Sequence, residues 1–199
     1  MANWISIIRT LLALGTVALL FRQAQAIYWL GFVLTVIVIW MDGLDGYVAR
    51  KFNESSKTGA VIDILCDRIV EQIYWVAYLA LGWVPLWVPL VVIMRGISVD
   101  GLRGLALERG FTAFGDTTMM QSKIGWWLVS SPLSRWSYAF FKAAAFAFLI
   151  LAHMPNASSV FSPDILALLT YVANASVYIA VFFCVVRGLP VLIEGRRFL

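Results

Sequence analysis

The stretch WMDGLDGYVARKFNESSKTGAVIDILCDRIVEQ, residues 40–72, decides what kind of protein this chain is. Apolar sequence lies on both sides of it, yet it contains four aspartates, Asp42, Asp45, Asp63 and Asp67. A charged side chain at the centre of a membrane-spanning helix costs about 2.5–3.5 kcal/mol on insertion scales. Acidic residues within a membrane-spanning segment therefore predict a functional site, because the packing of helices does not require charged side chains.

The composition places the whole chain in a membrane. Of its 199 residues, 62% are hydrophobic and 13% are charged, with a mean hydropathy of +0.87. A soluble domain is about half apolar and about a quarter charged. We therefore expect an all-α polytopic membrane protein, a single domain over residues 1–199, within the lipid bilayer. The net charge of +4 is typical of basic membrane loops and gives no reason to expect a nucleic acid partner.

Apolar runs of about 20 residues, the length that spans a bilayer, predict six transmembrane helices. They cover residues 4–21, 27–48, 60–81, 86–107, 136–153 and 165–186. Apart from Arg22, the Lys and Arg residues of the loops fall on one side of this arrangement, and the positive-inside rule makes that side cytoplasmic. We expect both termini and the acidic site to face the cytoplasm, and the protein to be integral to the cell (inner) membrane.

The spacing of the acids divides them into two pairs. Asp42 and Asp45 are three residues apart and Asp63 and Asp67 are four apart, so each pair lies on one face of its helix. A short polar connection joins the two helices, and antiparallel neighbours would bring the pairs together. Carboxylate oxygens favour hard divalent cations such as Mg²⁺, Mn²⁺ or Ca²⁺, which would also relieve the repulsion between the acids.

Two other interpretations of the acids remain open at this point. They could form ion pairs with arginines, for which the candidates are Arg9, Arg50, Arg68 and Arg95. They could also line the path of a cation transporter, since intramembrane acids mark ion pathways. Neither interpretation accounts for Gly46 and Gly59, because glycine costs about 1 kcal/mol in a helix and allows a ligand to approach the backbone closely.

The order of these residues resembles the signature of the CDP-alcohol phosphotransferase (CDP-alcohol phosphatidyltransferase) family. The chain reads Asp42-x-x-Asp45-Gly46-x-x-Ala49-Arg50, then eight residues, then Gly59-x-x-x-Asp63-x-x-x-Asp67. The start of the chain is similar to the Asn-x-x-Thr-x-x-Arg motif of bacterial members, with Asn3, Ser6 and Arg9 at its positions and serine in place of threonine.

The resemblance implies an enzyme that transfers a phosphatidyl group from CDP-diacylglycerol to an alcohol and releases CMP. It implies two Mg²⁺ or Mn²⁺ ions as cofactors, with Asp42, Asp45, Asp63 and Asp67 as their ligands. Asp67 would be the catalytic base that accepts the proton of the acceptor hydroxyl. The resemblance also implies a homodimer and a CDP-lipid site formed by Gly46, Ala49, Arg50 and Gly59. An inactive member acting as a scaffold fits poorly, because the set of acids is complete.

The acceptor has to be recognised by the later part of the chain, about residues 86–135. Arg95 and Arg103 lie about 12 Å apart along one side of the predicted helix. With Lys123 they predict a site for a phosphorylated acceptor, although the arginines could instead snorkel or neutralise acids. Their spacing resembles that of bacterial phosphatidylglycerophosphate synthases, which implies glycerol 3-phosphate as acceptor. Gly96 stands where those enzymes usually carry Glu, and inositol phosphate or another alcohol is the alternative.

Overall fold

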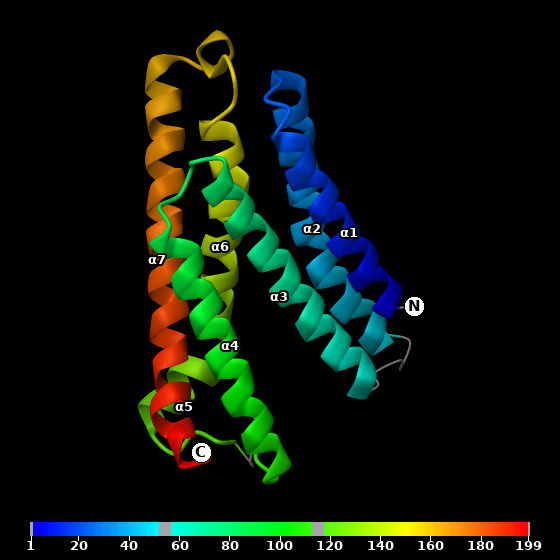
Figure 1. Ribbon diagram of the computed structural model, residues 1–199, viewed down its shortest axis with the longest axis vertical. Coiled ribbons are helices and arrows are strands. Elements are labelled where there is room, and N and C mark those ends of the chain that lie inside the picture. The colour runs from blue at the N-terminus through cyan, green and yellow to red at the C-terminus, as the bar shows by residue number, and fades with distance from the viewer. Residues whose placement is uncertain (1, 52–56, 113–117, 199) are drawn as a thin grey trace. The chain divides into compact units, whose positions relative to one another are not determined.

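A computed structural model describes residues 2–51, 57–112 and 118–198 (Figure 1). Side chains are described over the same ranges except at residues 2–3, 44–51, 57–58 and 60. The α-helices are α1 (Ala2–Leu20), α2 (Gln25–Lys51), α3 (Lys57–Ala80), α4 (Trp87–Glu108), α5 (Lys123–Ser130), α6 (Pro132–Ala152) and α7 (Pro163–Gly195). Short 3₁₀ helices, η1 (Ala157–Ser159) and η2 (Arg196–Phe198), precede and follow α7. The expectation of an all-α fold is confirmed for the described residues.

The long helices begin within a few residues of the predicted ones. The main difference is at α7, which continues past the predicted end at residue 186 to Gly195 and contains Pro190. With 33 residues and a rise of about 1.5 Å per residue, α7 is about 50 Å long. Because this exceeds the roughly 30 Å of a hydrocarbon core, α7 is longer than a spanning helix needs to be.

Three helical segments of the described chain are long and apolar enough to cross a membrane by length and composition: Gln25–Gly43, Pro132–Ala152 and Pro163–Phe198. A shorter apolar segment covers Trp4–Leu20. Charged side chains interrupt the apolar character of α3 and α4, where Asp63, Asp67, Arg95 and Arg103 lie. The chain is therefore a helical membrane protein, and the six-span arrangement with cytoplasmic termini stays a prediction.

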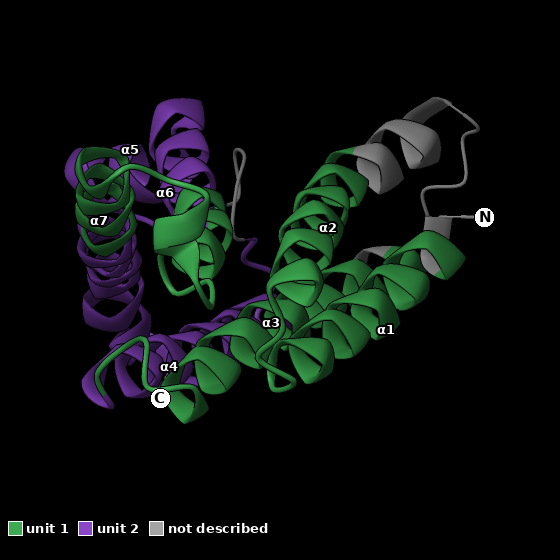
Figure 2. Ribbon diagram, turned by 90° about the horizontal axis from the view of Figure 1, so that it is seen from above, with its two compact units in different colours: residues 1–85, 143–174 green, residues 86–142, 175–199 purple. Residues whose placement is uncertain are grey.

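The described chain forms two compact units, coloured separately in Figure 2. Unit 1 comprises residues 1–85 and 143–174, and unit 2 comprises residues 86–142 and 175–199. Helices α6 and α7 each contribute residues to both units. The signature acids belong to unit 1, whereas the basic residues expected to bind the acceptor belong to unit 2.

In unit 1, α1 packs against both α2 and α3, as Figure 1 shows. An aromatic cluster joins α3 to the second half of α6. The ring of Tyr74 stacks on Phe146 with centroids 4.7 Å apart, and the Tyr74 hydroxyl donates to Thr35 Oγ1 of α2 over 3.0 Å. One turn later, the fully buried Tyr78 donates its hydroxyl proton to the Phe146 carbonyl oxygen over 2.7 Å. These contacts fix α3, which carries two signature acids.

In unit 2, the irregular stretch between α4 and α6 contains the short helix α5. The Ser122 side chain caps this helix by accepting from the Gly125 amide over 2.9 Å. The Glu194 carboxylate of α7 accepts hydrogen bonds from the Gln121 amide and the Ser122 hydroxyl. Gly125 has to be small, because a Cβ there would lie 2.5 Å from Glu194 Oε1. The end of α7 thus positions α5.

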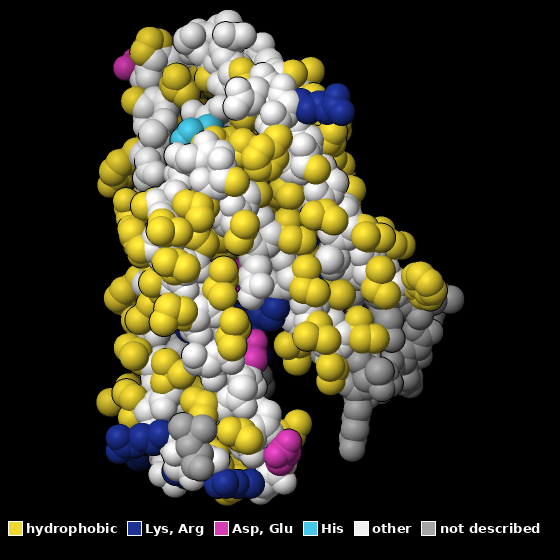
Figure 3. Space-filling view, viewed as in Figure 1, with side chains coloured by type: hydrophobic (Ala, Val, Ile, Leu, Met, Phe, Trp, Pro, Cys, Tyr) yellow, Lys and Arg dark blue, Asp and Glu magenta, His cyan; other side chains and the backbone are white. Residues whose placement is uncertain are grey.

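The surface matches the membrane assignment. Figure 3 shows apolar side chains covering the lengths of the helices, whereas lysines and arginines gather over the C-terminal ends of α4 and α7, both in unit 2. The exposed basic residues of these ends are Arg109, Arg196 and Arg197. This is the distribution expected where the ends of membrane helices meet the headgroup region.

The buried hydroxyl of Tyr78 provides a test of the unit 1 core. Tyr78→Phe removes the hydrogen bond to the Phe146 carbonyl, and a bond of this kind contributes about 1 kcal/mol. For a chain of this size, we expect the thermal unfolding midpoint in detergent to fall by about 2–4 °C. Tyr171→Phe is the matched control, because Tyr171 is 73% exposed. Equal midpoints for the two variants would contradict the assigned role of Tyr78.

Candidate functional site

Arg9 of α1 lies at the centre of the acidic residues of unit 1. Its side chain is 2% exposed, and its two terminal nitrogens form ion pairs with Asp42 of α2 and Asp67 of α3. Arg9 Nη2 also lies 3.8 Å from Asp63 Oδ1. One buried guanidinium therefore joins three of the four signature acids, and it does so because α1 packs against both helices that carry them.

The three acids are more exposed than the arginine. The side chains are 56% exposed for Asp42 and 45% for both Asp63 and Asp67. The Asp63 Oδ1 atom is nevertheless buried, and among the described residues it has no hydrogen-bond partner, since 3.8 Å is too long for a hydrogen bond. Three carboxylates around one guanidinium leave an excess of negative charge at a surface that ligands can reach.

The other signature residues are placed less fully. Gly59 lies in the first turn of α3 and is partly buried. The side-chain positions of Asp45, Gly46, Ala49 and Arg50 lie outside the described part of the structure, although their backbone belongs to α2. Among the described side chains, no group of three or more acids, histidines or cysteines stands ready to hold a metal ion. Arg9 occupies the space among the acids that are described.

A second charged cluster lies in unit 2, where basic side chains of α4, α6 and α7 meet. The Arg187 guanidinium lies 5.7 Å from the ring centroid of Tyr138, and Lys142 Nζ lies 5.4 Å from the same ring. Arg187 also donates to the Val129 carbonyl over 3.4 Å. Its electrostatic neighbours include Arg95, Arg103 and Arg135. We call the four arginines and Lys142 the basic cluster.

Arg95 is the most deeply placed member of the basic cluster. It is 9% exposed and runs directly against the α7 backbone at Gly188, where a Cβ would lie 2.7 Å from Arg95 Cγ. The Nε atoms of Arg95 and Arg187 are buried and have no hydrogen-bond partner among the described residues. Cations brought together with unused donors favour the binding of an anion that can accept several hydrogen bonds.

Lys123 has a different setting. It is exposed in the first turn of α5 and lines a surface hollow of about 460 Å³ with Met120, Gln121, Ser122, Trp126 and Trp127. The sequence predicts an acceptor site formed by Arg95, Arg103 and Lys123, whereas the contacts described above for the basic cluster involve Arg187 and Lys142. The sequence provides no reason to place Arg187 in this cluster, because it stands 92 residues after Arg95. Its one distinguishing feature in the sequence is that it follows a long apolar run.

The comparison with known proteins agrees with the signature. The profile of the CDP-alcohol phosphatidyltransferase family matches residues 1–186. This match covers most of the chain, including α1, the signature acids and every member of the basic cluster except Arg187. The chain therefore belongs to the CDP-alcohol phosphatidyltransferase family.

Several characterised relatives share a single name. The chain is 28% identical over 125 residues to the CDP-diacylglycerol–glycerol-3-phosphate 3-phosphatidyltransferase of Mycoplasma pneumoniae, covering 54% of this chain and 55% of that protein. It is 27% identical over 158 residues to the Bacillus subtilis protein of the same name, covering 79% of this chain and 69% of that protein. A Mycobacterium tuberculosis relative, 29% identical over 155 residues (74% and 73% of the two chains), carries a cardiolipin synthase name instead.

The matched part thus spans little more than half of the Mycoplasma protein. The name of the Mycobacterium relative thus differs from the name that the Mycoplasma and Bacillus relatives share.

Arg9 provides the test of the acidic site. Arg9→Gln leaves three carboxylates facing one another without their cation, and we expect a loss of about 1–3 kcal/mol of stability, less than for a fully buried pair because the acids are half exposed. Arg9→Lys keeps the charge and should lose less. The measurement is the thermal midpoint in detergent with EDTA present.

Arg22→Gln is the matched control for Arg9→Gln, because Arg22 is exposed in the turn that follows α1. We expect the control to unfold with the wild-type midpoint. If Arg9→Gln also unfolded with the wild-type midpoint, Arg9 would not be the cation that holds the acids together.

Proposed function

We propose that this protein transfers a phosphatidyl group from CDP-diacylglycerol to glycerol 3-phosphate and releases CMP. The observation that carries the proposal is the meeting of signature acids from two helices around one point of unit 1, in a chain of this family. The names of the Bacillus and Mycoplasma relatives, which include both substrates, support it.

We propose that two Mg²⁺ or Mn²⁺ ions bind to Asp42, Asp45, Asp63 and Asp67. The residues fit such ions in three respects: the donors are all carboxylate oxygens, the described ones are half exposed, and Asp63 Oδ1 has no hydrogen-bond partner among the described residues. The position among the acids already holds a cationic group, Arg9. Bound ions would supply positive charge that stabilises the CMP leaving group.

The chemistry required of the chain is the activation of an alcohol. The acceptor hydroxyl has to lose its proton as its oxygen attacks phosphorus, and the Asp67 carboxylate is the proposed acceptor of that proton. The Asp67 carboxylate is half exposed and forms an ion pair with Arg9. We propose that Gly46, Ala49 and Gly59 leave room for the cytidine nucleotide at the helix surface and that Arg50 grips the diphosphate.

For the acceptor, we propose that the basic cluster binds its phosphate. Arg95 and Arg103 are the residues expected from sequence, and the contacts of Arg187 add a third arginine to them. Guanidinium groups hold phosphate oxygens through paired hydrogen bonds, and the buried Nε atoms of Arg95 and Arg187 offer donors for such an anion. Lys123 remains a proposed acceptor residue in its exposed place on α5.

We further propose the arrangement in the cell. The chain would form one domain over residues 1–199 with six spans and both termini in the cytoplasm, where nucleotide and glycerol 3-phosphate are dissolved. It would lie in the cell (inner) membrane as a homodimer. The alternation of basic and non-basic loops supports this orientation.

The first test of the proposal is the release of CMP from CDP-diacylglycerol in detergent micelles containing glycerol 3-phosphate and Mg²⁺. We expect EDTA to abolish release and excess Mg²⁺ or Mn²⁺ to restore it. Asp67→Asn should lower kcat by about 10²–10⁴-fold, the usual contribution of a general base. Asp164→Asn, an exposed acid at the start of α7, is the control and should retain activity. Near-normal turnover by Asp67→Asn would refute its catalytic role.

The second test addresses the acceptor. We expect Arg103→Gln and Arg187→Gln each to raise the KM for glycerol 3-phosphate by about tenfold or more, since a hydrogen bond to a charged group contributes about 1.5–3 kcal/mol. Arg196→Gln, at an exposed position, should leave the KM unchanged. The same assay is run with inositol 1-phosphate, inositol, serine and phosphatidylglycerol as acceptors. Activity with one of these in place of glycerol 3-phosphate would overturn the acceptor assignment and leave the reaction class intact.

A further inference from the structure

Glu71 is a buried carboxylate that the signature does not include. It lies on α3 in unit 1, four residues after Asp67, and is 3% exposed. Residues spaced by four lie on nearly the same helix face, so Asp63, Asp67 and Glu71 form one stripe along α3. Glu71 therefore continues the acidic stripe from the half-exposed site into the buried part of the unit.

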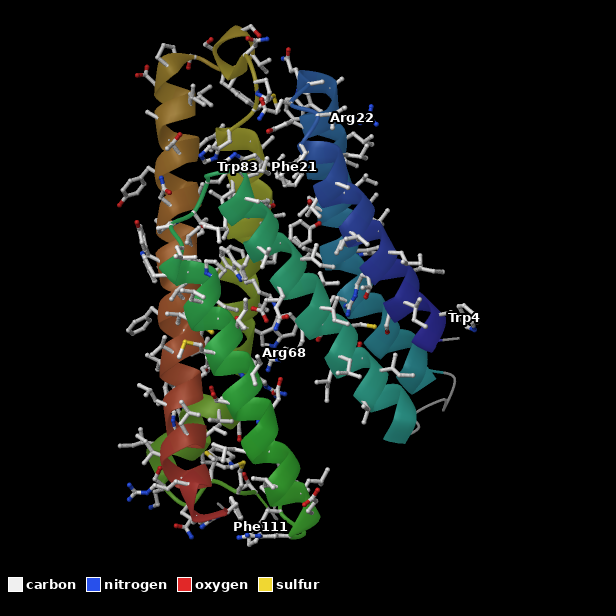
Figure 4. All side chains as sticks on the ribbon, in the orientation of Figure 1. Trp4, Phe21, Arg22, Arg68, Trp83 and Phe111 are labelled. Carbon is white, nitrogen blue, oxygen red and sulfur yellow. The ribbon has the colours of Figure 1, made fainter. Side chains whose placement is uncertain are left out.

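One partner of Glu71 is Arg68. Arg68 Nη1 lies 3.4 Å from Glu71 Oε2, and the Arg68 side chain is 23% exposed. Figure 4 labels this side chain where it leaves α3. Arg68 directly follows Asp67 in the sequence. The contact with Glu71 holds the Arg68 guanidinium near the helix face that carries Asp67. Part of the Arg68 side chain remains exposed.

A buried carboxylate is costly in an apolar helix unless it is paired, and an apolar side chain of similar size would pack there without that cost. The pair thus has to be explained by something other than packing. A guanidinium carries five N–H donors, enough to hold Glu71 and to bind a phosphate oxygen as well. The contact with Glu71 limits the rotamers of the long Arg68 side chain, which leaves less entropy to lose when an anion binds.

We propose that Glu71 is a positioning residue that acts through Arg68, and that Arg68 contacts the diphosphate of the CDP-linked lipid donor. This inference rests on the proposed function. Arg68 would bring to the donor a positive charge that is additional to Arg50 and adjacent to the proposed base. Glu71 itself would touch neither the donor nor the acceptor.

The alternative is a purely structural ion pair. In that case, loss of Glu71 or of Arg68 would lower the thermal midpoint and the yield of folded protein, but the molecules that fold would bind the donor normally. The two interpretations predict different values of the KM for the donor, because loss of a structural pair would not change it. They also predict different effects of combining the two substitutions.

The experiment is a double-mutant cycle on the KM for CDP-diacylglycerol, measured as a mole fraction in mixed micelles at saturating glycerol 3-phosphate. The variants are Glu71→Gln, Arg68→Gln and the double variant. We expect each single substitution to raise the donor KM by about tenfold or more. The double variant should be no worse than Arg68→Gln alone, because Glu71 has nothing left to position. The KM for glycerol 3-phosphate should stay at its wild-type value.

Two further variants keep the result interpretable. Glu71→Asp retains the carboxylate and should recover part of the donor affinity, and it serves as the test of Glu71 if Glu71→Gln does not fold. Glu108→Gln, at an exposed acid at the end of α4, is the matched control and should change nothing.

The results distinguish the positioning role of Glu71 from the proposed function. Additive effects in the double variant, or unchanged donor KM with only a lowered thermal midpoint, would overturn the positioning role while the proposed function stands. A wild-type protein that releases no CMP with any acceptor would overturn the proposed function and this inference with it.

Discussion

Several carboxylates of unit 1 lie beside one another among membrane helices, where their mutual repulsion has to be balanced. Arg9 balances this repulsion by pairing with acids of two different helices while being almost fully buried itself. Arg9 can reach acids of both helices because α1 packs against α2 and α3. The aromatic contacts of Tyr74 and Tyr78 then fix the far half of α3 on its neighbours.

The two units concentrate side chains of opposite charge. Unit 1 gathers acids, which favour cations as ligands, and unit 2 gathers arginines and a lysine, which favour an anion. A reaction between a diphosphate-linked lipid and a phosphorylated alcohol needs both kinds of site, since the first requires charge neutralisation of the leaving group and the second a clamp for phosphate. The proposed function assigns these two roles to the acids of unit 1 and to the basic cluster of unit 2.

Much of the fold was predictable from the sequence because a lipid environment imposes a simple rule on helix length. Runs of about 20 apolar residues placed the long helices within a few residues. The end of α7 was missed, because Arg187 marked the end of the apolar run whereas the helix continues to Gly195. The Tyr138 ring and the Val129 carbonyl both contact Arg187, and this allows a cation within the continuing helix.

The site was predictable only in part. The fixed spacing of the acids indicated two faces that meet, and Arg9 was among the candidate partners. Its central place was not evident, because it stands 33 residues from Asp42 and 58 from Asp67. Spacing rules act over one helical turn, so they give no information on contacts between helices. The same limit concealed Arg187 in the basic cluster, and Glu71 gave no motif to recognise.

In the proposed reaction, the hydroxyl oxygen of the acceptor attacks the phosphorus of a CDP-linked lipid at the acidic site. The most direct measurement uses glycerol 3-phosphate labelled with ¹⁸O in its free primary hydroxyl, with mass spectrometry of the phospholipid product and of CMP. If the acceptor oxygen attacks phosphorus, the label is retained in the new phosphodiester of the product and is absent from CMP. Labelled CMP, or a phosphodiester without the label, would contradict the proposed reaction.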